Sequence, residues 1–338
     1  NGRQLVRAIA GGVTVPVEEG QFEIEPETGK DIVSTIDVFI QEVTENALMK
    51  MMIKNEATSG VAMVMEVKTG KIKAIANLGK ISEGVYREDL NYAMTPTEPG
   101  STFKLVTLLS ALEDGKVTLN SRVNLEGGTW QVAGQTVYDS EKHGKFDASV
   151  LEAFEESSNV GMAKIAMASY NNNVDVYFKH LTKLRLDSTS GIDLVGEKQP
   201  RIVKPGNKIW GPTTLPWMAF GYNIEIAPIQ TLNLYNAIAN NGVMMKPYLV
   251  NAIQEEGRIL KSFSPKVYNA QLCKPSTIRD LRIALEGVCI NGTGKKLFAN
   301  SLYKVAGKTG TAKVANGNKG YGEGIFQSSF AGYFPADN

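Results

Sequence analysis

Strand-like runs at both ends of the chain constrain its fold most strongly. GVAMVMEV and KIKAIANL, at residues 60–67 and 71–78, alternate apolar and polar positions and meet at a Lys-Thr-Gly turn, which predicts a β-hairpin. Late in the chain, residues 301–314 and 328–334 predict two more strands. Because mostly helical sequence separates these ends, we expect an α+β fold in which helices pack on one largely antiparallel sheet assembled from both ends of the chain.

The middle of the chain carries apolar residues at helical spacing. Gly115 is placed to end one predicted helix, and Pro228 and Gly242 mark the start and the end of another. Short strand-like segments at 122–140 and a second hairpin at 248–263 interrupt the helical pattern. An amphipathic helix is predicted at 37–55, before the first hairpin. The other predicted helices cover 99–115, 149–157, 159–169, 226–242 and 275–288.

Composition excludes several functional classes. A formal net charge of +1 over 338 residues gives no reason to expect nucleic acid or an anionic membrane as a partner. His143 and His180 form no HExxH motif, so we expect no metal site and no histidine-dependent triad. Cys273 and Cys289 match no zinc or redox spacing, so we expect two buried, small apolar side chains. A disulfide between them would require an oxidising compartment. Acyl-transfer chemistry here would need a base other than imidazole.

Ser101-Thr102-Phe103-Lys104 places a hydroxyl and an amine three residues apart at the head of a predicted helix. Residues at this spacing share a helix face, so the Lys104 amine can reach the Ser101 hydroxyl. Burial or a second cation would lower the pKa of Lys104 and let it accept the serine proton. A serine cap followed by an exposed lysine would explain this pattern equally well. Ser301 and Lys304 repeat the spacing, but we expect them in a strand, on opposite faces.

Ser157-Ser158-Asn159 lies between two predicted helices. A second serine hydroxyl could relay a proton to a leaving group, and the asparagine amide could bind both the lysine and a substrate carbonyl. An ordinary helix-capping turn would explain the same residues. Ser169-Tyr170-Asn171 matches the same SxN pattern by chance, at the end of a predicted helix.

Lys308-Thr309-Gly310-Thr311 lies on a predicted strand with small residues on both sides. A glycine weakens a strand interior unless another backbone or a ligand approaches closely, so an extended substrate could pair along this edge. Lys308 and the threonine hydroxyls would suit a carboxylate, and the N–H of Thr311 could donate to an oxyanion. The earlier Lys68-Thr69-Gly70 is explained by its hairpin turn.

The three motifs occur in the order SxxK, SxN and KTG that serine penicillin-recognising enzymes use. With them, the chain resembles the transpeptidase domain of a class B, monofunctional penicillin-binding protein over nearly all of its length. Division-type members are more similar to it than elongation-type ones. The resemblance implies the fold shared with serine β-lactamases, an antiparallel sheet flanked by helices with an inserted helical subdomain. The similar landmarks are GKDIVSTIDVFIQ, VMEVKTGKIKAIAN, EPGSTFK, SSNVGMAKIA, SGIDLVGE, FGYNIEIAPIQ and VAGKTGTA.

The resemblance also implies a role for each site residue, and no cofactor. Ser101 would attack the penultimate D-alanine carbonyl of a peptidoglycan stem peptide, with Lys104 as its base. Ser157 would pass the proton to the leaving amine, and Asn159 would position Lys104 and the substrate amide. An amine from a second stem would then resolve the acyl-enzyme into a cross-link, whereas β-lactams would stall at the ester. Lys308, Thr309 and Thr311 would hold the carboxylate beside Gly310, and the N–H groups of Ser101 and Thr311 the oxyanion.

The same resemblance implies a domain organisation and a place in the cell. Residues 1–30 would be the remnant of an N-terminal non-catalytic (pedestal) module, and 31–338 the transpeptidase domain without the family's final strand and helix. The domain would face the periplasm, anchored to the inner membrane by an N-terminal helix outside this chain. Septal cell-wall synthesis would be its task. Its partners would be stem peptides, β-lactam antibiotics, divisome proteins and a glycosyltransferase.

Other functions fit parts of the pattern. A D,D-carboxypeptidase would use the same residues with water as the acceptor, and a covalent β-lactam sensor would acylate without turning over a stem peptide. A serine β-lactamase would need a second base, and Glu197 lies at a suitable distance after SxN, but its GIDLVGE context indicates a structural role. GVCINGTGKK, at 287–296, fails the P-loop spacing because Thr293 stands where the lysine is required.

Overall fold

The computed structural model describes residues 6–9, 13–16, 29–140, 144–313 and 325–337. Contacts divide the chain into two compact units, one formed by 1–34 with 250–264 and the other by 35–249 with 265–338. His143 lies outside the described residues. Within the described ranges, no helix combines the length and the apolar character needed to cross a bilayer.

The first unit contains two small antiparallel sheets. β1 (Val6–Ile9) pairs with β2 (Val13–Pro16). β14 (Val250–Glu255) lies between β3 (Asp31–Ser34) and β15 (Arg258–Ser262). The predicted hairpin at 248–263 is therefore confirmed.

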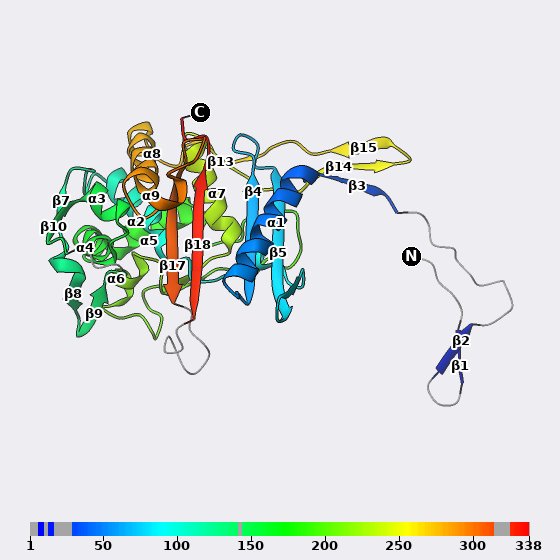
Figure 1. Cartoon of the computed structure of the whole chain (residues 1–338), viewed down its shortest axis with the longest axis horizontal. Helices are drawn as coiled ribbons and strands as arrows, with labels where there is room; N and C mark the ends of the chain where they lie inside the picture. Colours follow the sequence, from blue (N-terminus) through cyan, green and yellow to red (C-terminus); the bar gives the residue numbers. More distant parts are fainter. Residues whose placement is uncertain (1–5, 10–12, 17–28, 141–143, 314–324, 338) are drawn as a thin grey trace. The chain divides into compact units, whose positions relative to one another are not determined.

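The second unit holds the strands predicted from both ends of the chain. One sheet has the order β4 (Ser59–Met65), β5 (Ile72–Ser82), β6 (Val85–Arg87), and another pairs β17 (Ala306–Lys313) with β18 (Phe326–Tyr333). All of these pairings are antiparallel. We expected one sheet from both ends, but in the described ranges β4 and β18 are edge strands that share no ladder hydrogen bonds. β4 and β5 lie to one side of the β17–β18 pair in Figure 1.

Helices and short strand pairs fill the rest of the second unit, as the α+β prediction requires. The helices are α1 (Val38–Lys54), α2 (Lys104–Glu113), α3 (Val150–Glu155), α4 (Asn159–Tyr170), α5 (Val174–Lys183), α6 (Thr214–Met218), α7 (Pro228–Ala239), α8 (Pro275–Ile290) and α9 (Lys295–Phe298). The short pairs are β7 (Arg122–Asn124) with β10 (Asp147–Ser149), β8 (Thr129–Val132) with β9 (Gln135–Tyr138), β11 (Arg201–Ile202) with β12 (Ile224–Glu225), and β13 (Met244–Met245) with β16 (Val267–Asn269).

Helix α2 forms the centre of the main hydrophobic core. Its residues from Lys104 to Ala111 are all buried, and apolar side chains of α3, α4, α5, α7 and α8 surround them. Two buried hydroxyls are satisfied internally, since Thr107 Oγ1 donates to Ala219 O (2.9 Å) and Ser110 Oγ to Val106 O (2.8 Å). Because α2 is packed on every side, the residues that lead into it are held in one place.

Helix ends follow the signals read from the sequence. Gly115 follows α2 with φ of 64°, and α7 begins at Pro228 and is followed by Gly242 with φ of 86°. Helix α1 departs from the amphipathic prediction. Only Met52 is buried in it, whereas Val38 and Phe39 are 74% and 79% exposed. Its apolar contacts with the β4–β5 hairpin come from its C-terminal half, through the cluster around Met52. Near its N-terminus, Gln41 exchanges two hydrogen bonds with the backbone of Ile75 on β5 (3.2 and 2.8 Å).

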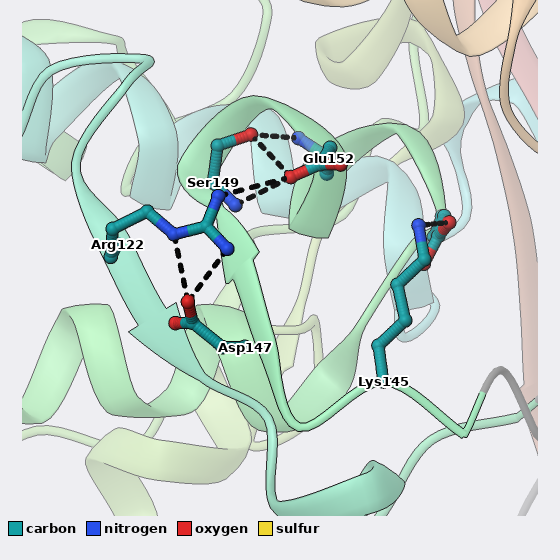
Figure 2. A network of polar contacts seen from close by, with 6 residues as sticks. Arg122, Lys145, Asp147, Ser149 and Glu152 are labelled. Atoms are coloured by element: carbon teal, nitrogen blue, oxygen red, sulfur yellow. Dashed lines mark hydrogen bonds and ion pairs between the residues drawn. The ribbon is translucent and has the colours of Figure 1, made fainter.

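A network of charged side chains holds the short helix α3 (Figure 2). Ser149 and Glu152 form a reciprocal capping box, in which Glu152 N donates to Ser149 Oγ (3.1 Å) and Ser149 N to Glu152 Oε2 (2.7 Å). Arg122 pairs with both Asp147 (2.6 Å) and Glu152 (3.5 Å). A helix of six residues is unstable alone, so these contacts stabilise the segment that leads to Ser157.

One expectation about individual residues needs correction, and the one about the two cysteines is confirmed. Ser301 and Lys304 lie in an exposed loop before β17, not in a strand, and Lys304 pairs with Asp337 (3.5 Å), so this SxxK copy still forms no buried pair. Cys273 and Cys289 are buried free thiols at opposite ends of α8. About 1.5 Å of rise per residue places them on the order of 20 Å apart, which is beyond disulfide reach.

The first Lys-Thr-Gly is a turn between β4 and β5, as predicted. Gly70 has φ of 78°, and a Cβ there would lie 2.6 Å from Lys246 O, so this position needs glycine for its turn and its packing.

Candidate active site

Ser101 lies in a 3₁₀ turn, Gly100–Phe103, that leads directly into α2. In 3₁₀ geometry residues i and i+3 eclipse each other, so Ser101 and Lys104 share a face. Gly100 has φ of 55°, and a Cβ there would lie 2.9 Å from Ala312 Cβ on β17. Gly100 N also donates to Gly221 O (3.3 Å). The turn that carries Ser101 is therefore packed between β17 and the Gly221 segment.

Lys104 is fully buried, and its amine points at the SxN turn. Its Nζ donates to Ser157 O (2.5 Å) and to Ser157 Oγ (3.0 Å). Burial lowers the pKa of Lys104 well below its usual value, the positive charge of Lys308 lowers it further, and the negative charge of Asp139 opposes both effects. A lysine with a pKa lowered in this way can act as a proton acceptor near neutral pH.

Ser157-Ser158-Asn159 joins α3 to α4, where the sequence predicted it. Ser157 has φ of 60°, a left-handed conformation that is uncommon for a residue with a side chain. Ser158 Oγ caps α4 by accepting from Gly161 N (2.9 Å). The Asn159 amide donates to Tyr138 O (2.7 Å), which ties α4 to the end of β9.

The Lys-Thr-Gly motif of β17 lies against the Ser101 turn. Lys308 and Gly310 are on the buried face of the strand, and Thr309 and Thr311 are on its more open face. A Cβ on Gly310 would lie 3.2 Å from Thr102 Cγ2 and 2.3 Å from Ser329 Oγ. Glycine is needed here because both neighbours approach closely.

The backbone of β17 presents polar groups on the edge opposite β18. Lys313 N donates to the Tyr222 hydroxyl (3.0 Å), so the N–H of Lys313 points away from β18. In an antiparallel pair, every second residue of a strand has its N–H and C=O on the same edge. By the same alternation, the N–H and C=O of Thr311 point to this edge. An extended ligand or an oxyanion could bind there.

Two residues at the site escaped the sequence-based reasoning. Asp139, just after β9, accepts hydrogen bonds from Ser158 Oγ (2.8 Å), Asn159 N (2.5 Å) and Val160 N (2.9 Å). Thr293 Oγ1 hydrogen-bonds with Thr309 Oγ1 (2.5 Å). Thr293 lies in the GVCINGTGKK segment, which was considered from the sequence only as a phosphate-binding loop. Asp139 belongs to no recognisable motif. Both residues are therefore identified only by the side chains that they contact in the structure.

Glu197 has a local partner. Ser190 N and Ser190 Oγ donate to its carboxylate at 2.6 and 3.0 Å, which closes the turn between them. In the ranges that the structure describes, no group of three or more His, Cys, Asp or Glu side chains could hold a metal ion.

Comparison with known proteins decides the family. A sequence model described as "Penicillin binding protein transpeptidase domain" matches residues 60–338. The chain belongs to this family.

Two curated relatives of this penicillin-binding protein domain are informative. Stage V sporulation protein D of Bacillus subtilis is 30% identical over 97% of the chain, and peptidoglycan D,D-transpeptidase FtsI of Escherichia coli is 26% identical over 92% of it. The chain covers 51% and 50% of these two proteins, so it spans about half of their length.

Solved structures agree with this fold. Penicillin-binding protein 3 of Mycobacterium tuberculosis, complexed with aztreonam, is 26% identical with a TM-score of 0.80, covering 92% of this chain and 71% of that one. The expected fold class, a penicillin-recognising α+β domain, is confirmed.

Proposed function

We propose that this chain is a peptidoglycan D,D-transpeptidase domain that cross-links stem peptides through a Ser101 acyl-enzyme and is inhibited covalently by β-lactams. The fully buried Lys104, hydrogen-bonded to Ser157 and one helical turn after Ser101, carries this proposal. The printed names of relatives, among them peptidoglycan D,D-transpeptidase FtsI and a penicillin-binding protein complexed with aztreonam, support the substrate and inhibitor class.

Acylation begins when Ser101 Oγ attacks the penultimate D-alanine carbonyl and its proton passes to the neutral amine of Lys104. The negative charge on the carbonyl oxygen is stabilised by the N–H groups of Ser101 and Thr311. Ser157 Oγ, 3.0 Å from Lys104 Nζ, gives its proton to the departing D-alanine nitrogen and recovers one from Lys104. The C–N bond breaks, D-alanine leaves and an ester on Ser101 remains.

Deacylation reverses the proton transfers with a new nucleophile. An amine from a second stem peptide attacks the ester carbonyl, loses its proton to the Lys104–Ser157 pair and expels Ser101 as a hydroxyl. Thr309 and Thr311, on the more open face of β17, hold the carboxylate of the donor peptide, while buried Lys308 adds positive charge from the opposite face. Gly310 allows the close packing of the strand. Asn159 orients the substrate amide. A β-lactam lacks a leaving group that diffuses away, so its ester persists.

We extend the proposal to the wider protein. Residues 31–338 would form the transpeptidase domain, and 1–30 the end of an N-terminal non-catalytic module. The domain would act in septal synthesis on the periplasmic face of the inner membrane, with divisome proteins and a glycosyltransferase as partners. The resemblance of its motifs to division-type members supports this role.

Labelling with a fluorescent penicillin tests the nucleophile. Ser101→Ala should abolish covalent labelling, whereas Ser301→Ala, in the second SxxK copy, should label like the parent. Persistent labelling of Ser101→Ala would overturn the assignment. Incubation with a stem peptide and an acceptor amine should yield a cross-linked product, and release of D-alanine without cross-link would indicate a carboxypeptidase. Turnover of a cephalosporin would indicate a β-lactamase, and acylation without any peptide turnover a sensor.

A further inference from the structure

We propose that Asp139 is a positioning residue, whose carboxylate holds the Ser157 turn against Lys104 and whose negative charge shifts the lower pH limit of acylation. This inference rests on the proposed function, because it assigns Asp139 to the same site. It concerns a residue outside the three motifs, on the segment that follows β9.

The carboxylate of Asp139 holds the first turn of α4. Its Oδ1 accepts from Asn159 N (2.5 Å) and Val160 N (2.9 Å), and its Oδ2 accepts from Ser158 Oγ (2.8 Å). A negative charge at a helix N-terminus is favourable, and hydrogen bonds to a charged acceptor are the strong kind. Asp139 therefore binds the three residues that directly follow Ser157.

Asp139 is itself held in place. Its own N–H donates to Gly128 O (2.9 Å), and the residue before it, Tyr138, pairs with Thr129 at the end of the β8–β9 hairpin. Tyr138 O in turn accepts from Asn159 Nδ2 (2.7 Å). The hairpin and the SxN turn are thus joined by side-chain and backbone contacts.

Ser157 requires such support. Its φ of 60° is unfavourable for a residue with a Cβ and persists only when surrounding contacts hold it. On one side, Ser157 N donates to Phe154 O (3.1 Å) and Ser158 N to Ala153 O (2.8 Å) at the end of α3. On the other side, the bonds to Asp139 fix the start of α4. Between these two anchors, Ser157 directs both its carbonyl and its hydroxyl at Lys104.

Burial has the largest effect on the pKa of Lys104, and two charged groups add opposing effects to it. Lys308, from β17, disfavours the protonated amine, and Asp139, from the segment after β9, favours it. If the negative charge of Asp139 is removed, Lys308 acts unopposed. The neutral amine, which is the base, then persists to lower pH.

The test measures the rate of acylation of the whole chain by a fluorescent penicillin between about pH 5 and pH 10. Asp139→Asn should move the acidic limb of the profile to lower pH by about 1 unit, because a nearby charge is lost. Its maximal rate should fall roughly tenfold, because the neutral amide holds the turn less firmly. Asp139→Glu, which keeps the charge but misplaces it, should lower the maximal rate and leave the limb near its parental pH.

Asp175→Asn is the matched control, since Asp175 is an exposed carboxylate in the first turn of another helix, α5. It should leave both the maximal rate and the limb unchanged. Asp139→Ser, which retains a capping oxygen without the charge, replaces Asp139→Asn should that variant fail to fold.

The proposal is overturned if the neutral variants keep the parental limb, whatever their maximal rate, because a purely structural role would not move it. Absence of labelling in the unsubstituted chain would instead overturn the proposed function itself. The two failures are therefore distinguishable.

Discussion

Gly221 fixes the position of the nucleophile, and replacing it with alanine should damage both stability and acylation. Gly221 has φ of 96°, and a Cβ built on it would lie 2.1 Å from Gly100 O and 2.6 Å from Gly100 N. The clash is with backbone, so no side chain can rotate away. The atom to be displaced belongs to the residue directly before Ser101.

The magnitude follows from two costs. A left-handed backbone costs a residue with a Cβ roughly 1–2 kcal/mol, and an overpacked contact costs about 1–3 kcal/mol. Gly221→Ala should therefore destabilise the fold by about 2–5 kcal/mol. With an average unfolding entropy of about 2.1 cal/mol/K per residue, the melting temperature of this 338-residue chain should fall by roughly 3–7 °C. Acylation should slow by about 100-fold if Ser101 moves by 1 Å.

Thermal unfolding followed by circular dichroism and the labelling rate with a fluorescent penicillin measure both effects. Gly211→Ala is the matched control, because a Cβ there meets nothing within 4 Å and its φ lies outside the left-handed range. It should change stability by less than about 0.5 kcal/mol. If Gly221→Ala melts and acylates like Gly211→Ala, the close approach of Gly221 to the Ser101 turn is refuted.

Three further predictions concern buried or bridging polar groups. Lys104→Met should abolish acylation yet stabilise the fold by roughly 1 kcal/mol. Because the pKa of Lys104 is lowered in the folded state, the parent loses stability as pH falls below about 10.4. The stability advantage of Lys104→Met, measured by urea unfolding, should therefore grow as pH falls, and an advantage that shrinks would refute this. Thr293→Val should weaken stem-peptide binding by about 3- to 10-fold with the maximal acylation rate unchanged, and an unchanged KM would refute a role for its bond to Thr309. Glu197→Gln should lower the melting temperature through its contacts with Ser190 and leave the acyl-enzyme lifetime unaltered in mass spectra, whereas a longer lifetime would make Glu197 a deacylating base.

Local signals in the sequence predicted much of the fold. The Thr-Gly turn of the first hairpin, Gly115 after α2 and Pro228 at the start of α7 each specify a backbone conformation by themselves. Features that depend on distant partners could not be predicted. Phe39 of α1 is exposed, although its periodicity would suit a buried helix face. The segment around Ser301 is a loop, although its residue types would suit a strand.

The candidate site was predicted where spacing along one element determines proximity. Ser101 and Lys104 lie one turn apart, so their shared face follows from helical geometry. The contacts of Lys104 with Ser157, and of β17 with the Ser101 turn, join distant parts of the chain. They could be predicted only from the order of the three motifs, because the spacing of residues along one element says nothing about them. Asp139 was missed because its three hydrogen bonds all connect it to the start of α4, about 20 residues later in the chain. A side chain that bonds only to distant residues produces no local sequence motif.

Mass spectrometry of the intact chain after incubation with a penicillin, followed by peptide mapping, tests the central claim most directly. That claim is that buried Lys104 activates Ser101 beneath β17. The account predicts a single adduct, located on the peptide that contains Ser101, and its loss in Lys104→Met. An adduct on another residue, or an undiminished adduct in Lys104→Met, would contradict it.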